Sequence, residues 1–320
     1  MKSICPYCKS KDYSIQYPTF DIFDNHYEVV KCKDCLAYFL TPNPPEELLA
    51  KAYDDSYYGG AEDDEKFEGF IEEGLNYFRK QRAKKVASLS KNMGRVLDIG
   101  CGNGQFLEQV QLFGHIEIFG TEMEGGSAGR AAKIKSLQLQ IGELKSDDFE
   151  DNYFDVITMF HVFEHLKNPK EYLSVIDEIL KSKAYLVISF PNIDSWQAQF
   201  FKGKWLHLDP PRHLFFFTPK DFKLLMKQRG YELVEEKYFS IEQNPYGAIQ
   251  SWLNLFHKKR ELLFESLKGN KAYVKQISPF VLVVEKLLFI GFTPLFILLD
   301  VISSVFKKSA TVEFTFQKKA

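Results

Sequence analysis

The chain has 320 residues, of which 26% are charged and 45% hydrophobic, and its formal net charge is −2. This composition is that of a globular protein and excludes a wholly disordered chain. The near-zero net charge lacks the basic excess that is typical of nucleic-acid-binding domains. The length suffices for one full α/β domain and a small additional module.

Four of the five cysteines form two Cys-x-x-Cys pairs, Cys5 with Cys8 and Cys32 with Cys35. Two such pairs can supply the four thiolates of a closed, structural zinc site. The first residues, MKSICPYCKS, lack the apolar segment of a secretory signal, so we expect reduced thiols in the cytoplasm rather than a disulfide framework. We favour one bound zinc ion over four unligated thiols.

Along the chain, short strands are expected at 12–17 and 26–31, and a long helix over 67–91. From residue 95 onward, apolar strands alternate with helices, which predicts a doubly wound, mostly parallel sheet. Thr218 is expected to cap a helix that has Pro219 in its first turn and ends before Gly230. The expected core strands cover residues 95–100, 116–122, 137–141, 154–162, 184–190, 231–239 and 311–317.

The first core strand runs into a glycine-rich turn, Asp98-Ile99-Gly100-Cys101-Gly102-Asn103-Gly104, which is followed by a helix. Glycines let the backbone approach a ligand closely, and the first turn of a helix has free N–H groups. Glu122 ends the second strand, where a carboxylate can accept both hydroxyls of a ribose. The combined spacing favours a ligand-binding loop over a plain structural turn.

Three segments carry a family resemblance: VLDIGCGNG at 96–104, GTE at 120–122 and FDVITMFHVFEHLKNP at 154–169. Over residues 67–239 the chain resembles class I methyltransferases that use S-adenosylmethionine (SAM), of the ubiquinone-biosynthesis O-methyltransferase type. The resemblance implies a Rossmann-like α/β fold. It also implies three groups of SAM contacts: Asp98, Gly100, Cys101, Gly102 and Gly104 for the methionine part, Glu122 and Met123 for the ribose, and Glu143 and Leu144 for the adenine, where the family often has Gly-Asp.

The fourth strand ends in a segment that carries His161, Glu164 and His165. These side chains are expected at the carboxyl edge of the sheet, where a histidine can take a proton from a hydroxyl or an acidic C–H group. The alternative is that Glu164 and His165 cap the following helix or brace the loop.

A second polar cluster, residues 205–215, follows the fifth strand and ends in a Pro-Arg-His-Leu segment that the family shares. A loop of this kind suits a lid or an acceptor pocket, although it can also be a packed loop with a buried histidine. His213 is our first candidate for the catalytic base, ahead of His165 and His161.

A zinc ribbon joined to a methyltransferase resembles two groups, bacterial sugar C-methyltransferases and ribosomal-RNA guanine methyltransferases. The ribbon of the second group usually has a histidine ligand and a basic surface, so four cysteines and no basic excess favour the first. We therefore expect methyl transfer to a small-molecule, sugar or lipid-linked glycan acceptor. An RNA methyltransferase and a non-catalytic SAM-fold scaffold are the alternatives.

An apolar segment at 277–306 lies between the last two expected strands. Its charge-free part, 287–299, is shorter than the about 20 residues that cross a bilayer, and Gly291 and Pro294 predict a break and a helical hairpin. Basic residues flank it, so we expect contact with the inner face of a membrane, with packing on a second copy or inside the protein as the alternative. The expected division is a zinc ribbon at 1–45, a linker and helix at 46–94, the SAM-binding core at 95–239, the apolar insertion at 240–310 and the last strand at 311–320.

Overall fold

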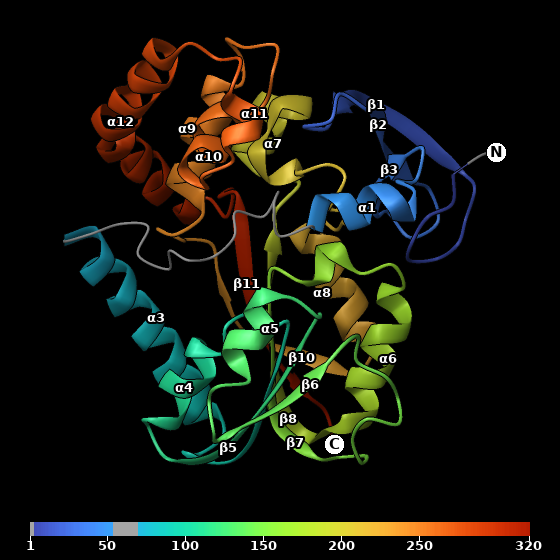
Figure 1. Cartoon of the computed structure of the whole chain (residues 1–320). Coiled ribbons are helices and arrows are strands. Elements are labelled where there is room, and N and C mark those ends of the chain that lie inside the picture. The colour runs from blue at the N-terminus through green and yellow to red at the C-terminus, as the bar shows by residue number, and fades with distance from the viewer. Residues whose placement is uncertain (1–2, 54–69) are drawn as a thin grey trace. The chain divides into compact units, whose positions relative to one another are not determined.

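The computed structural model describes residues 3–53 and 70–320, which fall into two compact units (Figure 1). The sheet unit contains Ala61–Phe190, Lys223–Glu236 and Glu313–Ala320. The ribbon unit contains Met1–Gly60, Pro191–Phe222 and Lys237–Val312. The finer division into five segments that the sequence suggests stays a prediction.

A seven-stranded sheet dominates the sheet unit, with the strand order β10-β11-β8-β7-β4-β5-β6. The neighbouring strands from β8 to β6 are all parallel, which confirms the predicted Rossmann-like α/β class. β8 begins earlier than expected because Lys181–Lys183 is polar and mostly exposed, and so gives no apolar signal. The strands are β4 (Met93–Ile99), β5 (His115–Glu122), β6 (Leu137–Ile141), β7 (Phe154–Phe160), β8 (Leu180–Pro191), β10 (Tyr231–Lys237) and β11 (Thr311–Lys318).

Helices connect these strands and supply the packing of the core. Pro169 opens α6 as predicted, and Thr218 Oγ1 accepts the N–H of Asp221 at 3.1 Å and so caps α8. The predicted start of the long helix at Phe67 lies outside the described residues. The helices are α3 (Phe70–Leu89), α4 (Gln105–Gln111), α5 (Gly126–Ala131), α6 (Pro169–Ile179) and α8 (Pro219–Gln228).

One apolar core fixes β4, the turn after it and α4 in place. Leu107 and Val110 of α4 are fully buried against Val96 of β4 and Ile118 of β5. Side chains in such a core are close-packed, so the turn between β4 and α4 has little freedom to shift. This turn is the glycine-rich segment that the sequence marks as a ligand site.

A second, antiparallel sheet lies in the ribbon unit, in the order β1-β2-β3-β9. Its last strand, β9, comes from the Pro-Arg-His segment and pairs Phe216 with Tyr38 of β3. Trp205 is fully buried in the same core, beside Val29 and Leu40. The N-terminal strands, of which β2 ends at Cys32, therefore share a sheet and a core with residues far along the chain. The strands are β1 (Tyr13–Phe20), β2 (His26–Cys32), β3 (Tyr38–Thr41) and β9 (Phe215–Phe216).

The rest of the ribbon unit is helical. The α-helices are α1 (Glu46–Tyr53), α7 (Trp196–Phe201), α9 (Asn244–Leu253), α10 (Leu262–Leu267), α11 (Lys271–Val274) and α12 (Pro279–Val305). Short 3-10 turns cover Lys202–Lys204 and Leu206–Leu208, and in the sheet unit Phe163–His165.

The apolar segment differs from its prediction, because α12 is one continuous helix through Gly291 and Pro294. The predicted hairpin was wrong. Pro294 removes one backbone donor, but α12 packs along α9, and this packing supports a continuous helix. The length considered from the sequence was also incomplete. It counted only the charge-free part, whereas α12 as a whole is long and apolar enough to cross a membrane.

Candidate functional site

The glycine-rich turn adopts backbone angles that glycine alone reaches readily. Gly100, Gly102 and Gly104 have φ angles of 71°, 58° and 80°, in the left-handed region. The N–H groups of Gly100 and Cys101 both donate to the carbonyl of Thr121, at 2.9 and 3.0 Å. These two bonds curl the turn over the carboxyl ends of β4 and β5.

Glu122 holds the tip of this turn. Its Oε2 accepts the N–H of Gly102 at 2.7 Å, and its Oε1 accepts the N–H of Met123 at 2.9 Å. A Cβ atom added at Gly102 would meet no atom within 4 Å. The backbone of Gly102 therefore faces open space beside a fixed carboxylate, which is the arrangement that a nucleotide-like ligand needs for close approach.

Asp98 and Cys101 lie beneath the turn. Asp98 is 4% exposed, and Oγ1 of Thr158 donates to its Oδ1 at 2.6 Å. Burial, with a contribution from the charge of Glu122, raises the pKa of Asp98 to about 7. The thiol of Cys101 packs toward Gly120, and burial raises its pKa to about 12, so this cysteine is not a reactive thiolate.

The segment after β6 completes this edge of the sheet. The N–H of Gly142 donates to the carbonyl of Glu122 at 2.8 Å, and a Cβ at Gly142 would also meet no atom within 4 Å. Glu143 is exposed and Leu144 is buried. The N–H of Leu144 donates to the hydroxyl of Tyr172 at 2.9 Å. Sequence reasoning missed Tyr172, because a tyrosine within a helix carries no motif that would mark it.

His161 and Glu164 lie together at the end of β7. His161 adopts a left-handed backbone, and its N–H donates to the carbonyl of Ser189 at 3.0 Å. Its Nδ1 is 3.4 Å from Oε1 of Glu164, which is 1% exposed. The turn Phe163–His165 is separate from α6, which begins at Pro169 after Asn168. Glu164 and His165 therefore do not cap α6.

His213 is held in a buried polar turn of the ribbon unit. Its Nδ1 is 2.8 Å from the carbonyl oxygen of His207, and its Nε2 is 3.7 Å from Oδ2 of Asp209. Burial alone would raise the pKa of Asp209, but the charges of Arg212 and His213 bring it down to about 2. Both ring nitrogens of His213 therefore lie close to oxygen atoms of the same turn. That His213 acts on an acceptor beside the glycine turn of the sheet unit stays a prediction.

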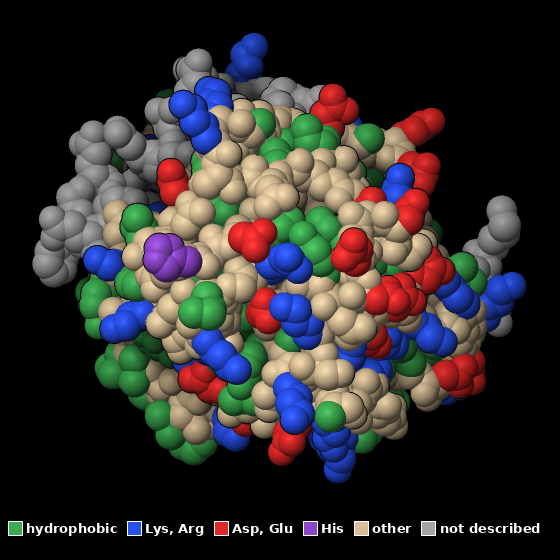
Figure 2. Space-filling model, turned by 90° about the horizontal axis from the view of Figure 1, so that it is seen from below, with side chains coloured by type: hydrophobic (Ala, Val, Ile, Leu, Met, Phe, Trp, Pro, Cys, Tyr) green, Lys and Arg blue, Asp and Glu red, His purple; other side chains and the backbone are tan. Residues whose placement is uncertain are grey.

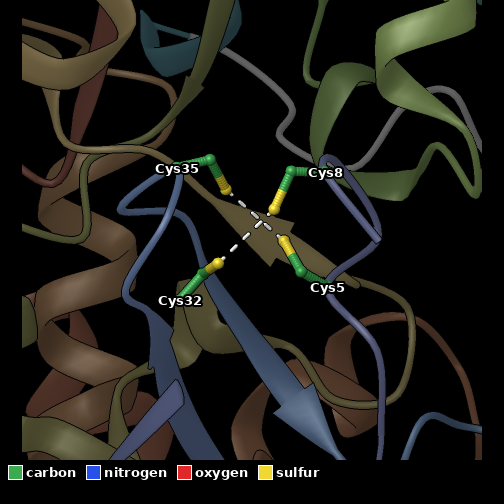
Figure 3. Close-up of side chains that lie close together, drawn as sticks. All are labelled: Cys5, Cys8, Cys32 and Cys35. Carbon is green, nitrogen blue, oxygen red and sulfur yellow. Dashed lines mark hydrogen bonds between the residues drawn. The ribbon is translucent and has the colours of Figure 1, made fainter. Parts of the chain in front are cut away.

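The two cysteine pairs converge on one point, as Figure 3 shows. Sγ of Cys5 is 3.5 Å from Sγ of Cys35, and Sγ of Cys8 is 3.5 Å from Sγ of Cys32. All four sulfur atoms lie within 4.8 Å of one another. Four sulfurs around a tetrahedral zinc at the usual bond length would be about 3.8 Å apart. The donor set and its spacing therefore fit a zinc ion.

Comparison with known proteins decides the family. Residues 68–236, more than half of the chain, match the family described as the methyltransferase domain. The chain belongs to this family. Its Rossmann-like sheet is that of a class I SAM-dependent methyltransferase domain, and the enzyme class predicted from the sequence is confirmed at the level of family and fold.

Individual relatives are distant. A ubiquinone biosynthesis O-methyltransferase of Ruegeria sp. (strain TM1040) is 28% identical over 156 residues, which cover 45% of this chain and 63% of the relative. One of Glaesserella parasuis serovar 5 is 31% identical over 108 residues, which cover 31% of this chain and 45% of the relative. The chain thus matches less than two thirds of the length of these relatives.

Solved structures show the same fold. A putative sarcosine dimethylglycine methyltransferase from Galdieria sulphuraria superposes with a TM-score of 0.52 at 14% identity, over 86% of this chain and 97% of that chain. The cyclase SpnF superposes with a TM-score of 0.50 at 15% identity, over 75% of this chain and 81% of that chain. One of the two is described as a cyclase, so the fold by itself does not specify the acceptor or the reaction.

Proposed function

We propose that the chain binds SAM on the turn between β4 and α4 and transfers its methyl group to a small-molecule, sugar or lipid-linked glycan acceptor. The observation that carries this proposal is the open space at Gly102 beside the fixed carboxylate of Glu122. The family membership supports it, and so does the confinement of these residues to the carboxyl edge of the sheet.

SAM, when bound, supplies an electrophilic methyl group on a sulfonium. In this proposal the backbone of Gly100, Gly102 and Gly104 holds the methionine part, Glu122 accepts the ribose hydroxyls and the Gly142–Leu144 segment borders the adenine. The protein's main task is alignment of donor and acceptor, because the transfer is an in-line displacement. The acceptor atom gains the methyl group and loses its proton to a base.

Three histidines are the proposed candidates for that base. In this proposal Nε2 of His213 takes the proton, and the ring is held by the contact of its Nδ1 with the His207 carbonyl at 2.8 Å. His161 has its Nδ1 3.4 Å from Oε1 of the buried Glu164, an arrangement that orients the ring. We assign the role to His213 first and propose His165 and His161 as the alternatives.

The cysteine cluster is proposed to hold one structural zinc ion. Thiolates of Cys5, Cys8, Cys32 and Cys35 would be its ligands. Because β2 and β3 share a sheet with β9, this ion would stabilise residues around 205–216 as well as the N-terminus. It has no part in methyl transfer.

A sugar or glycan acceptor is favoured over RNA. Basic and acidic side chains are interspersed on the face shown in Figure 2, and the net charge is −2. RNA-binding surfaces need a basic patch to neutralise phosphates. Mass spectrometry of products after incubation with SAM and panels of nucleotide-sugars, lipid-linked sugars and RNA tests the proposal. A methylated sugar would support the proposal. Methylated RNA would show that the acceptor is RNA and not a sugar. The absence of a methylated product with every panel would contradict the proposal.

A further inference from the structure

The helix α12 buries polar side chains and exposes apolar ones, the opposite of a helix that faces water. Its buried residues are Glu285, Asp300 and Ser303, whereas its most exposed side chains are large and apolar. A surface helix of a soluble protein turns its apolar stripe inward and its charged residues outward. We define the outer stripe of α12 as Phe280, Val283, Leu287, Ile290, Leu298 and Val305, which are 54% to 74% exposed.

The polar residues of α12 attach it to the ribbon unit at both ends. Oε1 of Glu285 is 3.0 Å from Nε2 of His257, near the start of the helix. Near its end, Oδ2 of Asp300 accepts the Nδ2–H of Asn244 at 3.2 Å. The hydroxyls of Ser303 and Ser309 lie 2.9 Å apart. The inward face of α12 is thus held by these polar contacts, and the outer stripe faces away from the ribbon unit.

The apolar surface continues beyond α12 through aromatic contacts. The ring of Trp252 lies 5.3 Å from that of Phe292 and 5.3 Å from that of Phe256, which is 66% exposed. At the other end, the ring of Trp196, 43% exposed, lies 5.4 Å from that of Phe306. A continuous apolar surface of this extent on a folded protein marks an interaction site.

We propose that the outer stripe of α12 inserts into one leaflet of an anionic membrane, with the helix lying in the membrane interface. Three exposed lysines support lipid as the occupant: Lys258 next to the apolar Phe256, Lys286 on the helix and Lys307 directly after it. Aromatic side chains and lysines around an apolar helix face are typical of interfacial helices, and each lysine strengthens attraction to anionic lipid.

The fold excludes a membrane-spanning arrangement of α12, although its length of about 40 Å would suffice for one. The chain on both sides of the helix, from Lys237 to Val312, belongs to the ribbon unit. Asp300 and Glu285 are both bound to residues that precede α12 in sequence. Both ends of α12 therefore lie on the same side of any membrane.

Flotation with vesicles of phosphatidylcholine, with and without phosphatidylglycerol, tests the contact. We expect the full chain to float with anionic vesicles and to detach as salt is added. Leu287→Glu with Ile290→Glu should lower binding by about ten-fold or more, since two charges would enter the apolar layer. The matched control is Leu112→Glu, at a residue 78% exposed in the sheet unit, which should change nothing. Equal flotation of both variants would overturn the proposal.

Two further measurements separate the alternatives. A tryptophan introduced as Ile290→Trp, in the middle of the helix, should be quenched most by lipids brominated near the headgroup. Quenching that is strongest with lipids brominated near the bilayer centre would mean that α12 spans the membrane. If the wild-type protein is a dimer that does not bind vesicles, and the Leu287→Glu, Ile290→Glu variant is a monomer, the outer stripe is a dimer interface. Because SAM binding should be the same in all these variants, failure here is distinguishable from failure of the proposed activity.

Discussion

The N–H of Gly102 and the carboxylate of Glu122 are joined by a hydrogen bond of 2.7 Å between the turn after β4 and the end of β5. Glycine is favoured at this position because its φ is +58°, and the lack of a side chain keeps the space beside its Cα open. The bond fixes both groups that the proposed SAM site depends on. Any change at either residue should therefore affect the cofactor before it affects the fold.

Glu122→Ala should weaken SAM binding by about ten- to a hundred-fold, because hydrogen bonds to a charged group contribute about 1.5–3 kcal/mol each. Glu122→Gln keeps an amide oxygen as acceptor and should lose less. Equilibrium dialysis with labelled SAM measures both variants, and thermal unfolding verifies that each one folds. An unchanged affinity of Glu122→Ala for SAM would contradict the proposed contact between Glu122 and the ribose.

His213→Gln should lower turnover by about a hundred-fold or more, which is the usual contribution of a general base. The glutamine amide can still donate to the His207 carbonyl, so the turn should keep its structure while the base is lost. SAM affinity should stay constant, because a base acts on the acceptor and not on SAM. Normal turnover in this variant would make His213 a packing residue, and His165 and His161 would be tested next.

Metal analysis of the wild-type protein should find about one zinc ion per chain. Cys32→Ser removes one of the four ligands and should abolish this stoichiometric binding. Hydrogen exchange should accelerate in β2 and β3 and in β9, since these strands share one sheet. Exchange in β4 and β5 should be unchanged. The matched control is Cys101→Ser, a buried cysteine outside the cluster, which should keep its zinc. Wild-type protein purified without chelators and found free of zinc would contradict the site.

Asp98→Asn should alter how stability depends on pH. The pKa of Asp98 rises from 3.8 to about 7 on folding, so between these values the folded state holds a proton that the unfolded chain has released. The free energy of unfolding should therefore fall as pH rises through this window. Asparagine cannot ionise and can still accept the bond from Thr158. Urea unfolding at pH 5 and pH 8 should show a smaller drop in the variant, and an equal drop would refute the assignment.

The sheet could be predicted because its signal is local: apolar strands alternate with helices, and the caps at Pro169 and Thr218 are short-range features. The glycine turn and the cysteine pairs could be found for the same reason, since their spacing is visible in the sequence. β9 could not, because a two-residue strand gains its order only from pairing with Phe39 and Tyr38. The continuity of α12 also depends on tertiary packing against α9, which outweighs the local effect of Pro294.

Isothermal titration of the full chain with SAM and with S-adenosylhomocysteine tests the central claim most directly. The wild-type protein should bind both, and Gly102→Arg should abolish the heat, because the arginine side chain would fill the open space at a left-handed position. The matched control is Gly230→Arg, at a glycine with φ +87° that also faces open space and lies outside the turn, which should bind like wild type. Absence of heat in the wild-type protein, or equal binding by folded Gly102→Arg, would contradict the account.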